Sequence, residues 1–421
     1  MINPTFDIEH LYAIFEECRS VSTDSRRIEA DTLFIALHGA NFNGNNYAIA
    51  ALEAGAAYAV IDSDAPIKER PDLEKRFFLC DDTLNALQLL ARYHRRQLAL
   101  PIIAIAGSNG KTTTKELVSR TLAERFEVCA TQGNLNNHIG VPLTLLSMRN
   151  TTEFGVVEMG ASSRGEIALL CEIAEPNYGI LTNIGRSHME GFGGVEGIRL
   201  GKGELFDYLA QNGGRAFVPK EDEVLSAMAS ERENLATELF SRSIGEGYHS
   251  HLVGEYNRAN IAATVAIGSY FGVDEVHIAA AIGSYIPSNN RSQEQFTERG
   301  NRLIIDCYNA NPSSMAAAIE NFATIEAEKR ILILGDMLEL GEWSAAEHRN
   351  VLQLAKGLAS TEIILVGEMF AKAAREIDID AKLFTSTAEC AESLQLYDIN
   401  SAAILLKGSR GIALEKLIQL L

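Results

Sequence analysis

The feature that most constrains the fold of this chain is the loop GSNGKT (107–112), which stands between an apolar run and a helical pattern. The run PIIAIAG (101–107) is typical of a buried strand, and apolar residues recur at helical spacing from 112 to 126. Glycines let backbone N–H groups surround phosphate, and the N-terminus of the following helix favours negative charge. The sequence therefore predicts an α/β domain that binds a nucleotide phosphate.

Each residue of this loop has an expected role in binding ATP. Lys111 would neutralise the β- and γ-phosphates, and the hydroxyl of Thr112 would hold Mg²⁺. The usual spacing places a glycine at position 105, where this chain has Ile105, so the loop is a shortened variant. The predicted nucleotide-binding residues here are Gly107, Ser108, Asn109, Gly110, Lys111, Thr112 and Thr113. The alternative is a glycine turn that binds no ligand.

Strand and helix patterns alternate beyond residue 101, which indicates parallel sheets. FGVVEM (154–159) and YGILTN (178–183) predict further buried strands. A stretch rich in Pro, Ser and Asn, IPSNNRSQ (286–293), precedes a second series with the runs RLIID, ILILGD, EIILVG and AAILLK. We therefore predict an α/β protein of three domains: a small mixed α/β domain over 1–99, a central phosphate-loop domain with a parallel sheet over 100–292, and a Rossmann-like domain over 293–421.

Polar or glycine residues repeatedly follow the C-terminal ends of the predicted strands. They are residues 107–111, Glu158, 182–183, Asp306, 335–336 and 407–408. Ligands of open α/β sheets bind outside those strand ends. Two such sheets that face each other would form one cleft between the second and third domains.

The formal net charge of −19 argues against binding to nucleic acid or to an anionic membrane, because such surfaces need a basic excess. The six cysteines lie far apart and form no CxxC pair, as expected for reduced thiols in a cytoplasmic protein. The N-terminus has no signal-peptide pattern, and no apolar run is long enough to span a membrane. We expect a cytoplasmic monomer whose local cations can still bind small anionic substrates.

Three further residues are candidates for a metal site. Glu158 follows a predicted strand and is either a magnesium ligand or a buried capping carboxylate. His188 follows the next strand, where an imidazole is a less usual ligand for a hard cation and a structural role is the alternative. Lys202 would repel both Mg²⁺ and Lys111, so it could instead bind a phosphate or lie in solvent. It would suit a metal cluster only if carbamylation made it an anionic oxygen ligand, which the sequence alone leaves open.

With these residues in place, the chain resembles the Mur ligases over nearly its whole length. The phrases that carry the resemblance are TDSR (23–26), GSNGKTTTKE (107–116), QGNLNNHIGVPLTLL (132–146), VEMGAS (157–162), TNIGRSHMEGFG (182–193), KGE (202–204), NRSQ (290–293), DCYNANPSSM (306–315), LGDMLELGE (334–342) and KGSRG (407–411). The GKTT loop and the lysine are shared across the family. GNLNNHIGVP, YNANP and LGDMLELG resemble the branch that adds D-alanyl-D-alanine to a UDP-linked muramoyl tripeptide.

The resemblance implies a first domain that binds the UDP-sugar, a second that binds ATP, and a third that completes the nucleotide site and receives the dipeptide. It implies Lys111, Lys202 and His188 as catalytic residues, and a carbamylated Lys202 that organises Mg²⁺ with Thr112, Glu158 and His188. Asn260, Arg291 and Asp306 would contact ATP. The residues implied to contact the UDP-muramoyl tripeptide or the dipeptide are Thr23, Asp24, Ser25, Arg26, Asn136, Asn137, Asn309 and Asn311.

The sequence departs from the family pattern at several positions. Tyr256 stands where His is usual, Asn43 and Asn45 replace a common Asp and His, and Arg186 and Cys307 replace small or acidic residues. The changes at Asn43 and Asn45 weaken any exact assignment of uridine contacts.

Several of the implied sites have a structural alternative. TDSR could cap a helix, Asn309 and Asn311 could form only a turn, Arg291 could make a linker ion pair, and LGDMLELGE could be a structural loop.

The implied activity is an ATP-dependent amide ligase that works through an acyl phosphate. A related Mur or folylpolyglutamate-type ligase is the nearest alternative, and an ATP-gated binding protein without ligation is a second. The diamino acid of the tripeptide, lysine or diaminopimelate, and the general base stay unassigned at this point.

Overall fold

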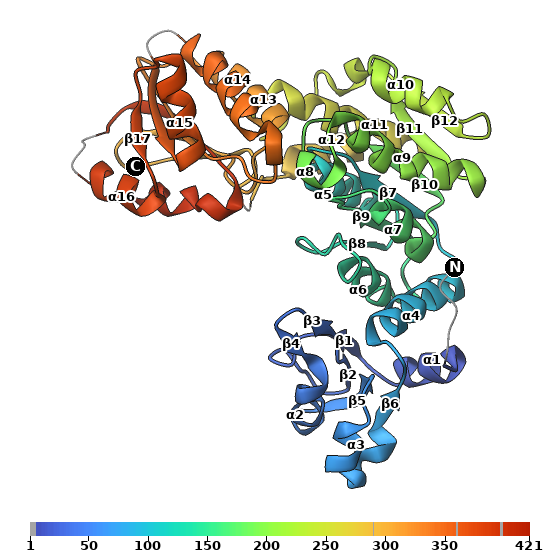
Figure 1. Cartoon of the computed structure of the whole chain (residues 1–421). Coiled ribbons are helices and arrows are strands. Elements are labelled where there is room, and N and C mark those ends of the chain that lie inside the picture. The colour runs from blue at the N-terminus through green and yellow to red at the C-terminus, as the bar shows by residue number, and fades with distance from the viewer. Residues whose placement is uncertain (1–5, 289, 359–360, 396–398) are drawn as a thin grey trace.

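The computed structural model describes residues 6–288, 290–358, 361–395 and 399–421. The chain forms three α/β parts in chain order, with the N-terminal part blue, the middle part teal to green, and the C-terminal part orange to red in Figure 1. Each part is built on its own largely parallel sheet. The predicted fold class is confirmed, whereas the predicted domain boundaries stay predictions. Within the described residues, none of the helices is both long and apolar enough to cross a membrane.

The N-terminal part is a parallel sheet in the order β1-β2-β5-β6, with helices on both faces. Its main elements are α1 (Ile8–Glu16), β1 (Ser20–Ser22), β2 (Thr32–Ile35), α2 (Ala48–Glu53), β5 (Ala56–Ile61), α3 (Ala65–Glu69), β6 (Phe77–Leu79) and α4 (Thr83–Leu98). Leu33 and Ile35 pack with α1 and α4, whereas Phe34 packs with α2. Successive residues of β2 point to opposite faces, so this strand is buried on both sides.

Helix α4 connects the N-terminal part to the middle part. Its predicted helical pattern is confirmed, and the helix ends at Leu98 before Ala99 adopts a left-handed conformation. Arg92 and Arg96 both form ion pairs with Glu175. The buried side chain of Arg95 donates to the backbone carbonyl of Glu175 at 2.9 Å. These contacts hold the first sheet against the sheet that carries the phosphate loop.

The middle part is a parallel sheet in the order β12-β11-β10-β7-β9-β8. Its strands are β7 (Ile102–Ala106), β8 (Val128–Ala130), β9 (Phe154–Glu158), β10 (Tyr178–Leu181), β11 (Arg215–Pro219) and β12 (Ala236–Phe240). Its helices are α5 (Lys111–Ala123), α6 (Gly140–Leu146), α7 (Glu166–Ala174), α8 (Met189–Phe192), α9 (Val195–Gln211), α10 (Glu223–Ser230), α11 (Glu255–Tyr270) and α12 (Glu275–Ser284). The predicted strands β7, β9 and β10 are confirmed, and helix α5 ends three residues before Phe126. Because β7 lies between β9 and β10, the C-terminal ends of these three strands meet around the phosphate loop.

The C-terminal part is a sheet in the order β13-β14-β18-β15-β16-β17. Its strands are β13 (Gln293–Phe296), β14 (Arg302–Ile305), β15 (Lys329–Gly335), β16 (Thr361–Val366), β17 (Lys382–Phe384) and β18 (Ala402–Lys407), and its helices are α13 (Pro312–Ala323), α14 (Ser344–Lys356), α15 (Glu368–Ile377) and α16 (Thr387–Leu394). The predicted strands β14, β15, β16 and β18 are confirmed. Strand β13 is antiparallel to β14 and forms the edge of the sheet.

The middle and C-terminal parts touch next to the phosphate loop. The side-chain amide of Asn311, at the start of α13, donates to Asn109 Oδ1 at 2.7 Å. Arg186 donates its backbone N–H to Ser313 Oγ at 2.9 Å and pairs its guanidinium with Glu347 at 2.6 Å. These contacts place the N-terminus of α13 directly beside the phosphate loop.

Candidate active site

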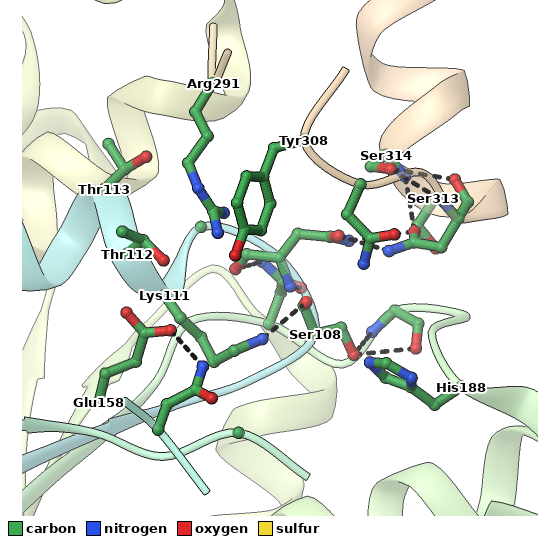
Figure 2. Close-up of a pocket in the computed structure, with 18 of the residues that line it drawn as sticks. Ser108, Lys111, Thr112, Thr113, Glu158, His188, Arg291, Tyr308, Ser313 and Ser314 are labelled. Atoms are coloured by element: carbon green, nitrogen blue, oxygen red, sulfur yellow. Dashed lines mark hydrogen bonds between the residues drawn. The ribbon is translucent and has the colours of Figure 1, made fainter. Parts of the chain in front are cut away.

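A cavity of about 660 Å³ lies between the middle and C-terminal parts, where the C-terminal ends of β7, β9, β10, β14 and β18 come together. Figure 2 shows the side chains that point into it from both parts. The sequence-predicted residues that line the cavity are Ser108, Asn109, Gly110, Lys111, Thr112, Thr113, Asn136, Asn137, Glu158, His188, Asn260, Arg291, Asp306, Asn309 and Asn311. The cleft predicted between the two domains is therefore present.

The phosphate loop has a backbone shape that requires its two glycines. Gly107 and Gly110 have φ angles of 130° and 81°. A Cβ added at Gly107 would lie 2.2 Å from Thr182 Oγ1, and one added at Gly110 would lie 2.6 Å from Asn260 Oδ1. Both positions therefore exclude a side chain for two reasons, the backbone conformation and the close neighbour.

The amine of Lys111 folds back over the phosphate loop. Its Nζ donates to the backbone carbonyls of Gly107 at 2.8 Å and Ser108 at 3.1 Å. Burial lowers the pKa of Lys111 to about 8; the carboxylate of Glu158 opposes this shift, and the guanidinium of Arg291 adds to it. An anion at the loop would raise this pKa again, because a nearby negative charge favours the protonated amine.

The loop is held from beneath by the residues that follow β10. Asn183 Oδ1 accepts from the Asn109 N–H at 3.0 Å, and Ser108 Oγ donates to the Gly185 carbonyl at 3.0 Å. Asn260, in α11, accepts from Thr114 Oγ1 at 3.2 Å and lies against Gly110. The loop is thus held in shape before any ligand binds. The described contacts of Asn260 are with protein groups, and its adenine contact stays a prediction.

Glu158 is a buried carboxylate with one oxygen free. The residue ends β9, is 1% exposed, and accepts from Asn136 Nδ2 at 2.7 Å through Oε1. Among the described residues its Oε2 has no hydrogen-bond partner. Thr112 lines the same cavity. A free carboxylate oxygen beside a hydroxyl group is the donor set that Mg²⁺ prefers, so these two residues fit that ion.

Lys202 lies in α9 at the back of this site rather than on its wall. The side chain is 1% exposed, donates from Nζ to the Ala161 carbonyl at 2.9 Å, and lies 4.9 Å from the centroid of the Phe192 ring. No ion pair with a described carboxylate is formed. Burial lowers the pKa of Lys202 well below its ordinary value, and the charge of Lys111 acts in the same direction. The amine is therefore held in surroundings that oppose its protonation.

His188 forms a contact across the domain interface. It follows β10 in a left-handed conformation with φ 52°, and its Nδ1 contacts the carboxylate of Glu339 in the C-terminal part. Burial lowers the pKa of His188, and the nearby Glu339 carboxylate opposes the shift. In this arrangement the imidazole joins the two domains. Because this contact uses Nδ1, a metal beside Glu158 would be bound through Nε2.

The C-terminal wall of the cavity carries two cations and an aromatic ring. Lys407, at the end of β18, forms an ion pair with Asp306, which follows β14. The guanidinium carbon of Arg291 lies 3.7 Å from the centroid of the Tyr308 ring (Figure 2). In the part of the chain that the structure describes, Arg291 has no carboxylate partner, so the linker ion-pair interpretation of this residue is wrong. Its charge is available to a ligand.

The predicted TDSR segment lies outside this cavity, in the N-terminal part. It follows β1 as a turn, and no helix begins at these described residues, so the helix-cap alternative is wrong. Arg26 donates to both carboxylate oxygens of Asp24, at 2.8 and 2.9 Å. The Arg26 guanidinium holds the pKa of Asp24 at about 2. Thr23, Asp24, Ser25 and Arg26 are therefore close to each other but remote from the phosphate loop, as a separate substrate-binding region would be.

The sequence of the chain matches three family models in order. They are "Mur ligase family, catalytic domain" over residues 17–95, "Mur ligase middle domain" over 105–248 and "Mur ligase, glutamate ligase domain" over 291–410. A UDP-N-acetylmuramoyl-tripeptide–D-alanyl-D-alanine ligase from Bacillus subtilis is 33% identical and covers 95% of this chain and 92% of its own length. The chain belongs to the Mur ligase family.

Solved structures of Mur ligases agree with the whole fold. MurF from Acinetobacter baumannii is 29% identical, covers 99% of this chain and 98% of its own, and superposes with a TM-score of 0.85. MurF from Thermotoga maritima, solved in complex with ADP, is 25% identical, covers 97% of each chain and superposes with a TM-score of 0.80. The arrangement of all three domains in this Mur ligase is therefore one that its relatives also adopt.

Four residues of the site and its domain contact were not assigned a role from the sequence. Tyr308, Glu339 and Lys407 line the cavity, and Arg186 joins the two domains beside it. Each lies within a sequence segment that resembles the family. For Lys407, its position at the end of a predicted strand also indicated a role at the site. The partners of Arg186 and Glu339 lie in another domain, so neither pairing has a local sequence signal. Asn311 caps α13 and bonds Asn109, which gives it both a structural and a site contact.

In the LGDMLELGE segment, one acidic residue has a structural role and another lines the cavity. Asp336 accepts from the backbone N–H groups of Met369 at 3.0 Å and Phe370 at 2.8 Å, in the first turn of α15. The side chain of Glu339, three residues later, lines the cavity. The alternative that this segment is a structural loop holds for Asp336, which stabilises the start of α15.

We expect Asp336→Ala to lower the free energy of unfolding of the C-terminal domain by about 1–3 kcal/mol, because two backbone donors lose their acceptor. Trp343 is the sole tryptophan and lies in this domain, so its fluorescence during urea unfolding reports the change. The exposed Asp380 of the same domain is the control, and Asp380→Ala should leave the transition in place. Equal transitions for both variants would contradict the capping role.

Proposed function

We propose that this Mur ligase joins D-alanyl-D-alanine to the terminal carboxylate of UDP-N-acetylmuramoyl tripeptide, with conversion of ATP to ADP and phosphate. The observation that carries the proposal is the meeting of the phosphate loop with Arg291, Asp306 and Lys407 in one cavity between two domains. The name of the relative from Bacillus subtilis supports the choice of substrates. The ADP in the Thermotoga maritima relative supports the nucleotide.

The chemistry begins with activation of a carboxylate. A carboxylate is a poor acyl donor because its leaving group would be oxide. Transfer of the γ-phosphoryl group of ATP to a carboxylate oxygen gives an acyl phosphate and ADP. The dipeptide amine then attacks the acyl carbon, and the tetrahedral intermediate collapses to the amide as phosphate leaves with its oxygen and the amine loses a proton. Each step brings anions together, so the site must supply positive charge.

Several residues of this chain would supply that positive charge or position the groups that do. Lys111 and the amides of its loop hold the β- and γ-phosphates, and Arg291 adds a second cation from the domain junction. Thr112 and Glu158 would hold Mg²⁺, which supplies further neutralisation of phosphate charge when bound. Asn136 keeps Glu158 oriented toward the cavity through its 2.7 Å hydrogen bond. Positioning the reactants together contributes further, since well-oriented groups gain about 7–11 kcal/mol.

Lys202 and His188 complete the proposed metal surroundings. A carbamate formed from the Lys202 amine and carbon dioxide would turn a buried cation into an anionic oxygen group. The burial of this amine, with a single carbonyl acceptor, supports that modification. His188 would bind the metal through Nε2, while its Nδ1 keeps the contact with Glu339.

The remaining assignments follow the division into domains over 1–99, 100–292 and 293–421. Thr23, Asp24, Ser25 and Arg26 would contact the UDP-sugar, and Asn260 the adenine. The residues proposed near the reacting groups are Asn136, Asn137, Asn309 and Asn311. The proposed location is the cytoplasm, with which the six free cysteines among the described residues are consistent, and the proposed state is a monomer.

Phosphate release in an omission series tests the proposed function. The purified protein receives Mg-ATP, UDP-N-acetylmuramoyl tripeptide and D-alanyl-D-alanine, and each is left out in turn. We expect release only when all are present. Phosphate release that does not depend on the dipeptide would favour an ATP-gated binding protein. Phosphate release that requires another amine, such as free glutamate, would favour a related ligase.

A further inference from the structure

Arg410 is a cation near the cavity whose charge has no ionic partner among the described residues. It follows β18 at the start of a short 3₁₀ turn, Arg410–Ile412, and its side chain is exposed. Within the described residues the guanidinium has neither an ion pair nor a hydrogen bond. The guanidinium carbon lies 5.3 Å from the centroid of the Tyr308 ring. Tyr308 lines the cavity and Arg410 does not, so Arg410 lies just behind this part of the C-terminal wall.

The other cations around the cavity already have partners or a predicted ligand. Lys111 bonds its own loop, Lys407 pairs with Asp306, and Arg186 pairs with Glu347. Arg291 stacks on Tyr308 and lies near Lys111 in Figure 2, on the side of the nucleotide phosphates. Arg410 is thus left to bind an anion other than those phosphates.

An apolar side chain lies next to Arg410. Leu338 is 48% exposed, and its backbone N–H donates to Ser409 Oγ at 3.0 Å. A Cβ added at Gly411 would lie 3.1 Å from Leu338 Cδ1, so Leu338 packs against the loop on both sides of Arg410 in sequence. Tyr308, Leu338 and Arg410 therefore lie on one small surface. They come from three separate sequence segments, YNANP, LGDMLELG and KGSRG.

We propose that Arg410 binds the terminal carboxylate of the acceptor dipeptide and that Leu338 contacts its methyl side chains. This inference rests on the proposed function. The acceptor has one carboxylate at the end opposite its reactive amine and two methyl groups between them. A guanidinium group binds a carboxylate through two parallel hydrogen bonds, which fixes direction as well as position. With its carboxylate held on the C-terminal domain, the dipeptide directs its amine toward the phosphate loop.

The test compares Arg410→Ala with the wild-type protein on two acceptors, D-alanyl-D-alanine and its uncharged C-terminal amide. We expect the variant to raise the KM for D-alanyl-D-alanine about 10- to 100-fold, since a charge pair in a binding site is lost. The KM values for ATP and for the UDP-linked substrate should stay unchanged. With the amide acceptor, both proteins should perform poorly and alike, because that acceptor has no carboxylate for Arg410 to bind.

Arg375→Ala is the matched control, because Arg375 is an exposed arginine of the same domain in α15. It should keep wild-type KM values for all substrates. An Arg410→Ala variant that loses the same factor on both acceptors, or whose KM for ATP rises instead, would overturn the inference, as would unchanged kinetics. If the wild-type protein itself makes no product with D-alanyl-D-alanine, the proposed function is wrong, and this inference is then wrong as well.

Discussion

Replacement of Lys111 by alanine is expected to reduce kcat by about 10³-fold or more, because the charge on the transferring phosphoryl group loses its main protein cation. Lys111 begins α5 and bonds the carbonyls of its own loop, so its amine is already placed where the phosphates would lie. Arg291 approaches from the domain junction and does not occupy the same position. The measurement is the rate of phosphate release at saturating concentrations of all three substrates.

Two controls separate this effect from unfolding. Lys372→Ala removes an exposed lysine from α15 and should leave kcat unchanged. Thermal unfolding of Lys111→Ala should still be one cooperative transition, which shows that the variant is folded although the bonds to the buried carbonyls of Gly107 and Ser108 are lost. Near-normal turnover by Lys111→Ala would refute the phosphate role of the loop.

Replacement of Lys202 by alanine is expected to lower kcat by at least about 10²-fold, since a charged group that organises the site is removed. Partial recovery is expected when formate or acetate is added at high concentration. Such an acid would restore two carboxylate oxygens in the space left by the side chain, which is 1% exposed in the native protein. The measurement is phosphate release as a function of added acid.

The recovery distinguishes a chemical role of Lys202 from a packing role. A cavity that merely destabilised α9 would lower the melting temperature, and added acid would not restore the rate. Lys372→Ala again serves as the control and should neither lose activity nor respond to acid. Full activity of Lys202→Ala without added acid would exclude the proposed carbamate.

The sequence predicted those elements whose signals are local. Strands β7, β9 and β10 are continuous apolar runs because both faces of the sheet are buried, and the loop that follows β7 requires glycines for its shape. Position at the end of a parallel strand also predicted that Glu158 and Asp306 would face one cleft. Both residues line the cavity, since the two sheets direct their C-terminal strand ends toward each other.

Other features depend on contacts that no local pattern encodes. The polar strand β13 was missed because, at the edge of a sheet, most of its side chains are exposed. The contact of His188 with Glu339 joins two domains, so it follows from domain orientation rather than from spacing. For Lys202 the sequence indicated only a misplaced charge, and its burial against Ala161 and Phe192 became visible in the fold.

The mass of the product formed from UDP-N-acetylmuramoyl tripeptide is the most direct test of the account. With Mg-ATP and D-alanyl-D-alanine present, we predict a product heavier than the tripeptide substrate by one dipeptide minus one water, formed in step with phosphate release. Tripeptides that end in lysine and in diaminopimelate, tested side by side, would identify the diamino acid that the enzyme prefers. Phosphate release with the UDP-linked substrate recovered at its original mass would contradict the account.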